Sequence, residues 1–198
     1  MEHIHHLAKD KKLAKILAAP YEELNRRNNL PLILIGSIMS QQLSTKVAKV
    51  IHQRFLALYP RKKPALKKIL ETPLPQLRSI GLSNAKANYV HNVARFFTEQ
   101  KLSDKKLHSM GNDDLIALLT QIKGVGRWTV EMLLMFALGR EDVFAVDDLG
   151  IQQAMIKLYK IDVSDKKAVR EKMQQISVKW SPYRTYACLY LWKWKDKK

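Results

Sequence analysis

The sequence is poor in cysteine and has no long apolar run. Cys188 is the only cysteine among 198 residues, which excludes an intramolecular disulfide, a cysteine-ligated iron–sulfur cluster and a thiolate zinc site. A reducing compartment suits this composition. Apolar runs such as Leu30–Ile35 and Met132–Leu138 are far shorter than the roughly 20 residues that span a bilayer. The first twelve residues have no apolar core, so we expect no secretory signal there.

Acidic residues are also scarce. The chain has 18 Asp and Glu against 35 Lys and Arg, a net charge of +17 and a pI near 9.9. Such an excess of positive charge favours a polyanionic partner, with nucleic acid first and an anionic membrane surface second. Hydrophobic residues make up 46% of the chain, which excludes a disordered polyelectrolyte and suits one domain or two small lobes.

The apolar residues recur at helical spacing almost throughout, which predicts an all-α bundle with short connections. One helix is expected over residues 4–17, another after the capping residue Ser44, and a last one with Ser181 as N-cap and Pro182 as its first residue. Only Val143–Val146 looks like a strand, and it is too short to build a sheet.

The most informative stretch is Leu119–Thr129, where two predicted helices flank Gly124-Val125-Gly126. Glycines two residues apart allow a sharp turn and let a ligand approach the backbone closely. The second helix begins at once, so its N-terminal N–H groups and dipole face the same point. We expect a phosphate site formed by Gly124, Gly126, Lys123, Arg127 and Thr129; the alternative is an ordinary tight turn between helices.

This stretch resembles the helix-hairpin-helix of the DNA glycosylase superfamily, whose signature continues into a loop and an aspartate, here Phe144–Asp148. Within it, the sequence is most similar to the bacterial 3-methyladenine DNA glycosylase II family. The residues SIMSQQLSTKVA at Ser37–Ala48 resemble the wedge region of that family, SIGLSNAKANYV at Ser79–Val90 its second turn and helix, and WSPYRTYACLYLW at Trp180–Trp192 its C-terminal pocket helix.

The resemblance implies an all-α, two-lobed helical bundle with a helix-hairpin-helix motif and a cleft between the lobes. It further implies a single glycosylase domain over residues 1–198, with the hairpin at 113–138 and the catalytic loop at 140–148. This would be the minimal form of the family, without an N-terminal β domain.

A glycosylase takes its target nucleotide out of the stack and stabilises positive charge on the sugar as the base leaves. Asp147 and Asp148 are both candidates for the carboxylate that does this, because either could instead cap the helix that follows. The resemblance assigns catalysis to Asp148. Asp147 is then expected to cap the helix or to form an ion pair with Arg184.

Trp128 occupies the place where related enzymes that also cut the backbone carry a lysine. The resemblance therefore implies hydrolysis without lyase activity. A tryptophan face also suits an alkylated purine, which carries positive charge. The implied base pocket consists of Trp128, Trp192, Met132 and Leu149. The alternative is that the two tryptophans belong to the core, where a large aromatic on a helix is usually found.

Base flipping leaves a gap in the duplex that an inserted side chain must fill. The resemblance places Leu43 in this wedge role with Gln42 beside it; the alternative for Leu43 is a hydrophobic contact with the start of the helix. Lys46 and Lys86 lie in the first turns of helices, where a cation opposes the dipole unless phosphate is bound there. Both are therefore candidate phosphate contacts, with solvated lysines as the alternative.

The resemblance also implies that the backbone carbonyls of Thr120, Ile122 and Val125 could hold a monovalent cation, Na⁺ or K⁺, with no other cofactor. The expected protein is a monofunctional glycosylase of base excision repair that acts on alkylated purines of the 3-methyladenine and 7-methylguanine type. Its expected partner is double-stranded DNA containing such bases. We expect a monomer, in the cytoplasm of a prokaryote or the nucleus of a eukaryote. A non-catalytic protein of the same fold that binds damaged DNA is the alternative.

Overall fold

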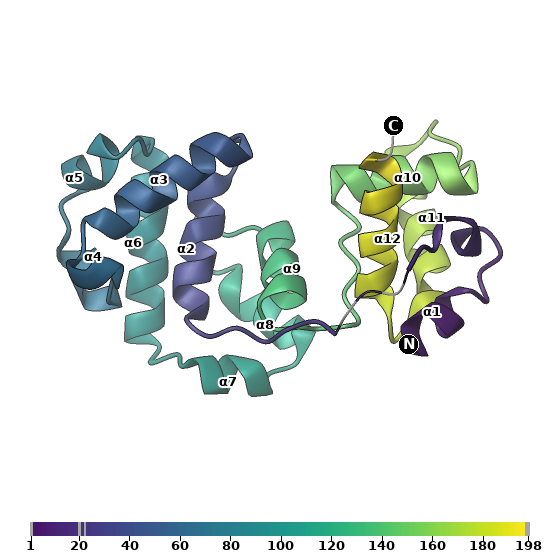
Figure 1. The fold of residues 1–198 in the computed structure, drawn as a ribbon, viewed down its shortest axis with the longest axis horizontal. Coiled ribbons are helices and arrows are strands. Elements are labelled where there is room, and N and C mark those ends of the chain that lie inside the picture. The colour runs from purple at the N-terminus through teal and green to yellow at the C-terminus, as the bar shows by residue number, and fades with distance from the viewer. Residues whose placement is uncertain (1, 20, 22, 197–198) are drawn as a thin grey trace. The chain divides into compact units, whose positions relative to one another are not determined.

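The computed structural model describes residues 2–19, 21 and 23–196 and is helical, as predicted (Figure 1). Among the described residues no strand is present, and no helix is long and apolar enough to cross a membrane. The chain divides into two compact units, one formed by residues 27–133 and the other by residues 1–26 together with 134–198.

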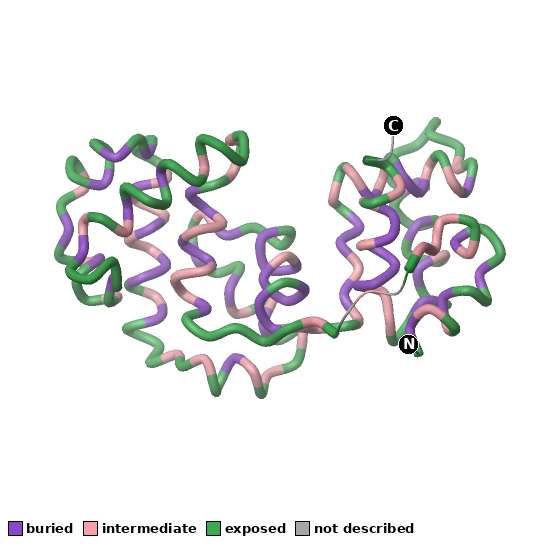
Figure 2. Tube along the Cα trace, viewed as in Figure 1, coloured by how far each residue is buried: buried purple, intermediate pink, exposed green. Residues whose placement is uncertain are grey.

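The unit formed by residues 27–133 is centred on two packed helices, α2 (Leu30–Ser40) and α6 (Asn84–Glu99). Buried residues recur along both helices (Figure 2). Among them, Ile38 and Val90 are fully buried in the core. The remaining elements are α3 (Thr45–Ala57), η2 (Pro60–Lys62), α4 (Leu66–Glu71), α5 (Leu74–Ser79), α7 (Asp104–Ser109), α8 (Asn112–Leu119) and the first part of α9 (Arg127–Phe136).

In α3, Ser44 caps the helix as predicted, because its hydroxyl accepts a hydrogen bond from the Val47 N–H at 3.4 Å. Ile51 and Phe55 are buried, but Val47 and Val50 are exposed. The buried stripe of this helix is therefore narrower than its apolar pattern suggests.

The other unit is built around α10 (Leu149–Tyr159) and α12 (Arg184–Asp196), which pack side by side (Figure 1). Trp180 and Tyr190 are fully buried in its core. Its other elements are α1 (Glu2–Leu7), η1 (Leu13–Ile16), α11 (Lys166–Ser177), η3 (Val178–Trp180) and the end of α9.

Three local predictions in this unit are wrong. The helix expected over residues 4–17 is interrupted, because the Asp10 carboxylate accepts hydrogen bonds from the N–H groups of Lys12 and Leu13 and so competes with the helical bonds. The last helix begins at Arg184, after a cis Ser181–Pro182 bond; its N-terminus is held by Asp142, which accepts a bond from the Arg184 N–H at 3.4 Å. Residues 143–146 form a loop instead of a strand.

Candidate functional site

Asp148 is the N-cap of α10, and its carboxylate is held from two sides. One oxygen, Oδ1, accepts the Ile151 N–H at 2.9 Å and the indole Nε1–H of Trp192 at 2.8 Å. The second bond comes from α12, so the packing of α10 against α12 fixes the direction of the carboxylate. An anion at a helix N-terminus is also stabilised by the helix dipole.

Gly150 protects this arrangement, and the sequence interpretation missed it. A Cβ added at Gly150 would lie 3.0 Å from Trp192 Cδ1, 3.1 Å from Trp192 Nε1 and 3.1 Å from Asp148 Oδ1. These distances are tighter than ordinary van der Waals contacts, so any side chain here would push the indole and the carboxylate apart. The glycine between the aspartate and the first buried residue of α10 was the available signal.

Asp147 has a separate role. Its carboxylate pairs with Arg170 of α11, with Nε–Oδ1 at 2.9 Å and Nη2–Oδ2 at 3.2 Å. The predicted ion pair with Arg184 is wrong, because the Arg184 guanidinium binds Asp142 instead. Burial works to raise the pKa of Asp142, but the hydrogen bonds from Arg184 and Ser181 outweigh it and lower that pKa.

Exposed apolar side chains accompany Asp148 and its partner Trp192. The ring of Trp192 lies 6.0 Å from that of Phe136 at an interplanar angle of 30°, and Leu149 is 67% exposed directly after the aspartate. Phe136 is itself exposed at the end of α9, and the sequence interpretation did not include it. Exposed aromatic and aliphatic side chains next to a carboxylate whose direction is fixed by hydrogen bonds are typical of a binding surface.

In the other unit, the hairpin between α8 and α9 has the expected turn, but its two glycines differ. Gly124 has a φ of +104°, and a Cβ there would lie 2.2 Å from the ring of Tyr89. Gly124 is thus required by backbone conformation and by the packing of Tyr89. A Cβ at Gly126 would meet no atom within 4 Å, so this position is open to an approaching ligand.

Helix α9 begins at Arg127, and its first internal hydrogen bond runs from the Val130 N–H to Gly126 O at 3.2 Å. The N–H groups of the first turn therefore point out of the helix end beside Gly126. Lys123 and Arg127 are exposed next to this end, although Arg127 Nε also donates to the buried Glu131 carboxylate at 2.9 Å.

Thr129 does not present its hydroxyl to solvent, as a direct phosphate contact of its side chain would require. The side chain is buried, and its Oγ1 lies 3.4 Å from Gln41 Nε2, which donates to it. This bond ties the start of α9 to the loop after α2.

That loop carries the two wedge candidates. Gln42 is exposed and has a φ of +57°, whereas Leu43 is half-buried and its N–H donates to Ser40 O at 3.2 Å. The outermost residue of the loop is therefore Gln42, and Leu43 is not the exposed tip that was predicted. A non-glycine residue in the left-handed region carries strain of the kind found at functional loops.

A hollow of about 370 Å³ lies beside this loop. It is lined by residues of α2, of the loop and of α9, namely Ser37, Ser40, Gln41, Gln42 and Trp128. Trp128 is 40% exposed, and Met132 follows it one turn later on α9 at intermediate exposure. The alternative that Trp128 is a core residue is thereby disfavoured. Ser37, Ser40 and Gln41 are lining residues that the sequence interpretation did not select.

The two lysines at helix starts differ. Lys46 is exposed in the first turn of α3. Lys86 instead extends to the C-terminal end of α2, where its ammonium donates to Met39 O at 3.1 Å and to Gln41 O at 2.6 Å. Burial lowers its pKa. A cation at the start of α6 is repelled by the positive end of the helix dipole, but here the two carbonyl oxygens stabilise the ammonium group. A bound phosphate is therefore not needed to explain a lysine at this position.

Thr120, Ile122 and Val125 lie where α8 ends and the hairpin turns. Thr120 is the C-cap of α8, and Ile122 O accepts the Val125 N–H at 2.9 Å. Carbonyl oxygens at a helix C-terminus carry partial negative charge, and a carbonyl that accepts one N–H keeps a second lone pair. The chemistry of these three carbonyls therefore fits a monovalent cation. In the described part of the chain, no cluster of three His, Cys, Asp or Glu side chains could hold a metal ion.

Comparison with known proteins decides the family. A profile described as HhH-GPD superfamily base excision DNA repair protein matches residues 35–179. The chain belongs to the HhH-GPD superfamily. This match covers the hairpin, the loop after α2 and Asp148, and it confirms the resemblance stated from the sequence motifs.

Relatives of this HhH-GPD protein carry glycosylase names. DNA-3-methyladenine glycosylase 1 of Schizosaccharomyces pombe is 35% identical over 176 residues, which cover 88% of this chain and 72% of the relative. A relative from Bacillus subtilis is 34% identical over 166 residues, and the match spans 57% of its length and 81% of this chain.

Solved structures agree with the fold. The Schizosaccharomyces pombe 3-methyladenine DNA glycosylase, determined in complex with abasic DNA, is 30% identical with a TM-score of 0.82, covering 98% of this chain and 96% of that one. A DNA-3-methyladenine glycosidase from Bacillus halodurans is 33% identical with a TM-score of 0.84, covering 97% of this chain and 88% of that one. The predicted all-α HhH-GPD fold is confirmed.

Proposed function

We propose that this HhH-GPD protein is a monofunctional DNA glycosylase that hydrolyses the N-glycosidic bond of alkylated purines in double-stranded DNA. The observation that carries the proposal is the Asp148 carboxylate, oriented by Trp192 and Ile151 at the N-terminus of α10. The names of the relatives support the same reaction and the same class of lesion.

The proposed step breaks the bond between C1′ of the sugar and the purine nitrogen. The bonding electrons leave with the base, which neutralises the positive charge that alkylation placed on it. C1′ becomes electron-poor, and the Asp148 carboxylate stabilises it electrostatically. A water molecule then forms the new C1′–O bond and loses a proton, for which Asp148 is the proposed acceptor.

The sequence of α9 supports hydrolysis without strand cleavage. Lyase chemistry needs an amine to form a Schiff base with C1′. The corresponding position holds Trp128, and α9, with the sequence RWTVEMLLMF, contains no lysine. The electron-rich face of the exposed Trp128 in turn suits a cationic alkylated base of the 3-methyladenine or 7-methylguanine type.

The hairpin and the loop after α2 are proposed to bind the DNA. A phosphate would approach the open side of Gly126 and meet the first-turn N–H groups of α9, with Lys123, Arg127 and Lys46 as surrounding cations. Gln42 and Leu43 are proposed to fill the gap left by the flipped nucleotide. The backbone carbonyls of Thr120, Ile122 and Val125 would hold a Na⁺ or K⁺ ion, whose positive charge offsets the partial negative charge of these oxygens. One protein molecule is proposed to act on one lesion.

The test is base release from duplex DNA treated with a simple methylating agent, with the released bases identified by chromatography. We expect free 3-methyladenine and 7-methylguanine, and no covalent protein–DNA adduct when borohydride is added. Binding to this DNA without base release would instead identify a non-catalytic damage-binding protein. A borohydride-trapped adduct would contradict the monofunctional assignment.

A further inference from the structure

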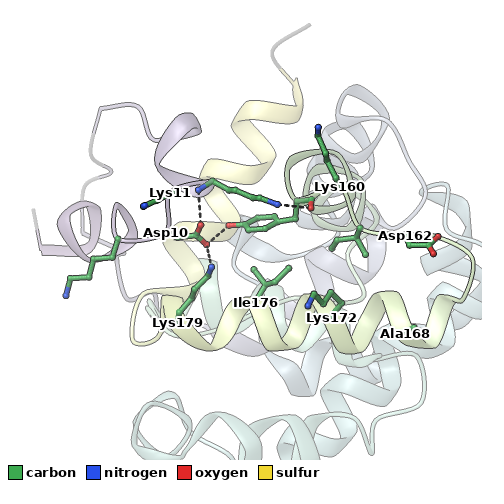
Figure 3. A pocket seen from close by; sticks show the side chains of 12 residues that line it. Asp10, Lys11, Lys160, Asp162, Ala168, Lys172, Ile176 and Lys179 are labelled. Atoms are coloured by element: carbon green, nitrogen blue, oxygen red, sulfur yellow. Dashed lines mark hydrogen bonds and ion pairs between the residues drawn. The ribbon is translucent and has the colours of Figure 1, made fainter.

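The unit that contains Asp148 has a lysine-rimmed pocket of about 740 Å³ that the proposed reaction does not use (Figure 3). It lies at the C-terminal end of α10, where Tyr159 and Lys160 line it. Asp148 caps the opposite end of this helix, so about 15 Å of helix separate the two. The other lining residues are Lys9, Asp10, Lys11, Lys12, Ile161, Asp162, Ala168, Lys172, Ile176 and Lys179.

On the inner side of the pocket, the charge of Asp10 is compensated by hydrogen bonds and an ion pair. Asp10, only 6% exposed, accepts hydrogen bonds from Tyr159 Oη at 2.5 Å and Trp180 Nε1 at 3.0 Å, and pairs with Lys179 Nζ at 2.9 Å. Lys12 Nζ donates to Tyr159 O at 3.0 Å. Figure 3 shows Asp10 where several of these bonds meet, with Lys179 next to it. The negative charge of Asp10 is thus already compensated inside the protein.

The rim carries an excess of positive charge. Six of the lining residues are lysines and two are aspartates, and the second aspartate, Asp162, accepts bonds from the N–H and hydroxyl of Ser164. Lys12 and Lys179 bond to Tyr159 and Asp10 as described above. The other four lysines are exposed, namely Lys9, Lys11, Lys160 and Lys172. Lysine ammonium groups on flexible stems suit phosphate oxygens that approach from several directions.

The remaining lining is apolar. It consists of Ile161, Ala168 and Ile176, together with the ring of Tyr159. The volume falls in the range of sites for small molecules and cofactors. A pocket with an aliphatic floor and a cationic rim matches a ligand that has a flat, weakly polar body and attached phosphates. A simple inorganic anion would leave the floor uncovered, and a purely apolar ligand would leave the lysines unpaired.

We propose that this pocket binds a nucleoside phosphate, with the base against Ile161, Ala168 and Ile176 and the phosphate held by Lys11, Lys160 and Lys172. A free nucleotide and the 5′-phosphorylated end of a DNA strand share this chemistry. The site is independent of the glycosylase reaction, because neither Asp148 nor any residue of the hairpin lines it.

Calorimetric titration of the full chain with ATP tests this site. Inorganic triphosphate carries only the phosphates of ATP, and adenosine carries only its base and sugar. We expect each of them to bind at least about tenfold more weakly than ATP. The double variant Lys11→Glu/Lys172→Glu should lose ATP affinity by about tenfold or more. The matched control, Lys166→Glu/Lys195→Glu, changes the net charge equally at exposed positions outside the pocket and should stay within about twofold of the unsubstituted chain.

Ala168→Phe provides a second test that leaves every lysine in place. Ala168 is an exposed residue of α11 on the pocket floor, so the larger ring fills the hollow without entering the core. It should weaken ATP binding while leaving the binding of inorganic triphosphate unchanged. Competition with a single-stranded decamer then identifies the source: displacement of ATP only by the 5′-phosphorylated form indicates a strand end, and no displacement by either form indicates a free nucleotide.

The proposal is overturned if ATP does not bind, or if inorganic triphosphate binds as tightly as ATP. It is also overturned if both double variants lose affinity equally, since the effect would then come from overall charge alone. Binding of a glutamate-rich peptide, without binding of ATP, would replace the nucleotide by an acidic protein partner. Because the readout is ligand binding, its failure leaves the excision assay for the glycosylase reaction unaffected.

Discussion

Replacing Trp192 by phenylalanine removes one hydrogen bond and little else. The indole Nε1–H lies 2.8 Å from Asp148 Oδ1, while a phenyl ring at the same place can keep the contact with Phe136. A hydrogen bond to a carboxylate is worth about 1.5 to 3 kcal/mol, and the partial exposure of Trp192 favours the lower end of this range. If the bond orients Asp148 toward C1′, its loss should slow excision by about 10- to 30-fold.

The assay is single-turnover release of 7-methylguanine from duplex DNA at saturating protein, measured beside the melting temperature and the affinity for abasic DNA. Trp194→Phe is the matched control, because Trp194 lies on the same helix and its ring is paired with Lys157. We expect the control to excise normally. Excision by Trp192→Phe within twofold of the unsubstituted chain would refute the positioning role, and a loss seen only with Trp192→Ala would assign Trp192 to base stacking.

Three further outcomes follow from the geometry. Gly126→Ala should weaken binding to undamaged and damaged duplexes alike, without a change in the melting temperature of the protein. Gly124→Ala should instead lower the melting temperature, because Gly124 has a positive φ and its Cβ would collide with the Tyr89 ring. Unchanged DNA affinity of Gly126→Ala in a fluorescence anisotropy titration would contradict the phosphate site. Leu43→Ala should slow excision from duplex more than from single-stranded DNA, since only the duplex has a gap to fill, and equal losses in the same excision assay would argue against a wedge. Burial works to raise the pKa of Asp10, but hydrogen bonds from Tyr159, Lys179 and Trp180 lower it from 3.8 to about 2. Its carboxylate therefore adds about 2 kcal/mol to the free energy of unfolding above pH 4, and this contribution is lost as the pH falls toward 2. Urea unfolding at pH 5 and pH 2.5 compares the free energy of unfolding of the unsubstituted chain with that of Asp10→Asn. The difference between the two should be smaller at pH 2.5, and a constant difference would be inconsistent with this pKa.

The sequence predicted features that depend on nearby residues. Ser44 caps its helix as expected, and Gly124 adopts the left-handed conformation that a hairpin glycine is suited to. Each of these depends on a few neighbouring residues, which is the range over which capping and turn chemistry acts. The motifs that carry the family resemblance are also local, so the family could be identified without coordinates.

Partners that are distant in the chain could not be predicted in the same way. Asp147 binds Arg170 instead of Arg184, and Lys86 reaches carbonyls more than forty residues earlier in the chain. Asp10, whose local bonds interrupt the first helix, also accepts a hydrogen bond from Tyr159, 149 residues later in the chain. Periodicity and propensity describe which face of a helix is apolar, but the element that covers that face is decided by tertiary packing.

Packing also explains the misjudged exposures. Val47 and Val50 belong to the apolar stripe of α3, yet both remain exposed, because α3 is covered on the side of Ile51 and Phe55. Thr129 is polar and close to the hairpin, yet it is buried against Gln41. In both cases the residue type predicted the opposite environment from the one that the neighbouring helix provides.

Single-turnover excision by Asp148→Asn tests the catalytic assignment most directly. An asparagine keeps the size of the side chain and an oxygen that can accept the bonds from Ile151 and Trp192, and it caps a helix as well as aspartate does, so only the negative charge is lost. We predict excision slower by about 100-fold or more, as for other preorganised charged groups, with an unchanged melting temperature and equal or higher affinity for abasic DNA. Asp147→Asn, which breaks the exposed pair with Arg170, should excise normally. Normal excision by Asp148→Asn beside a loss in Asp147→Asn would contradict the account.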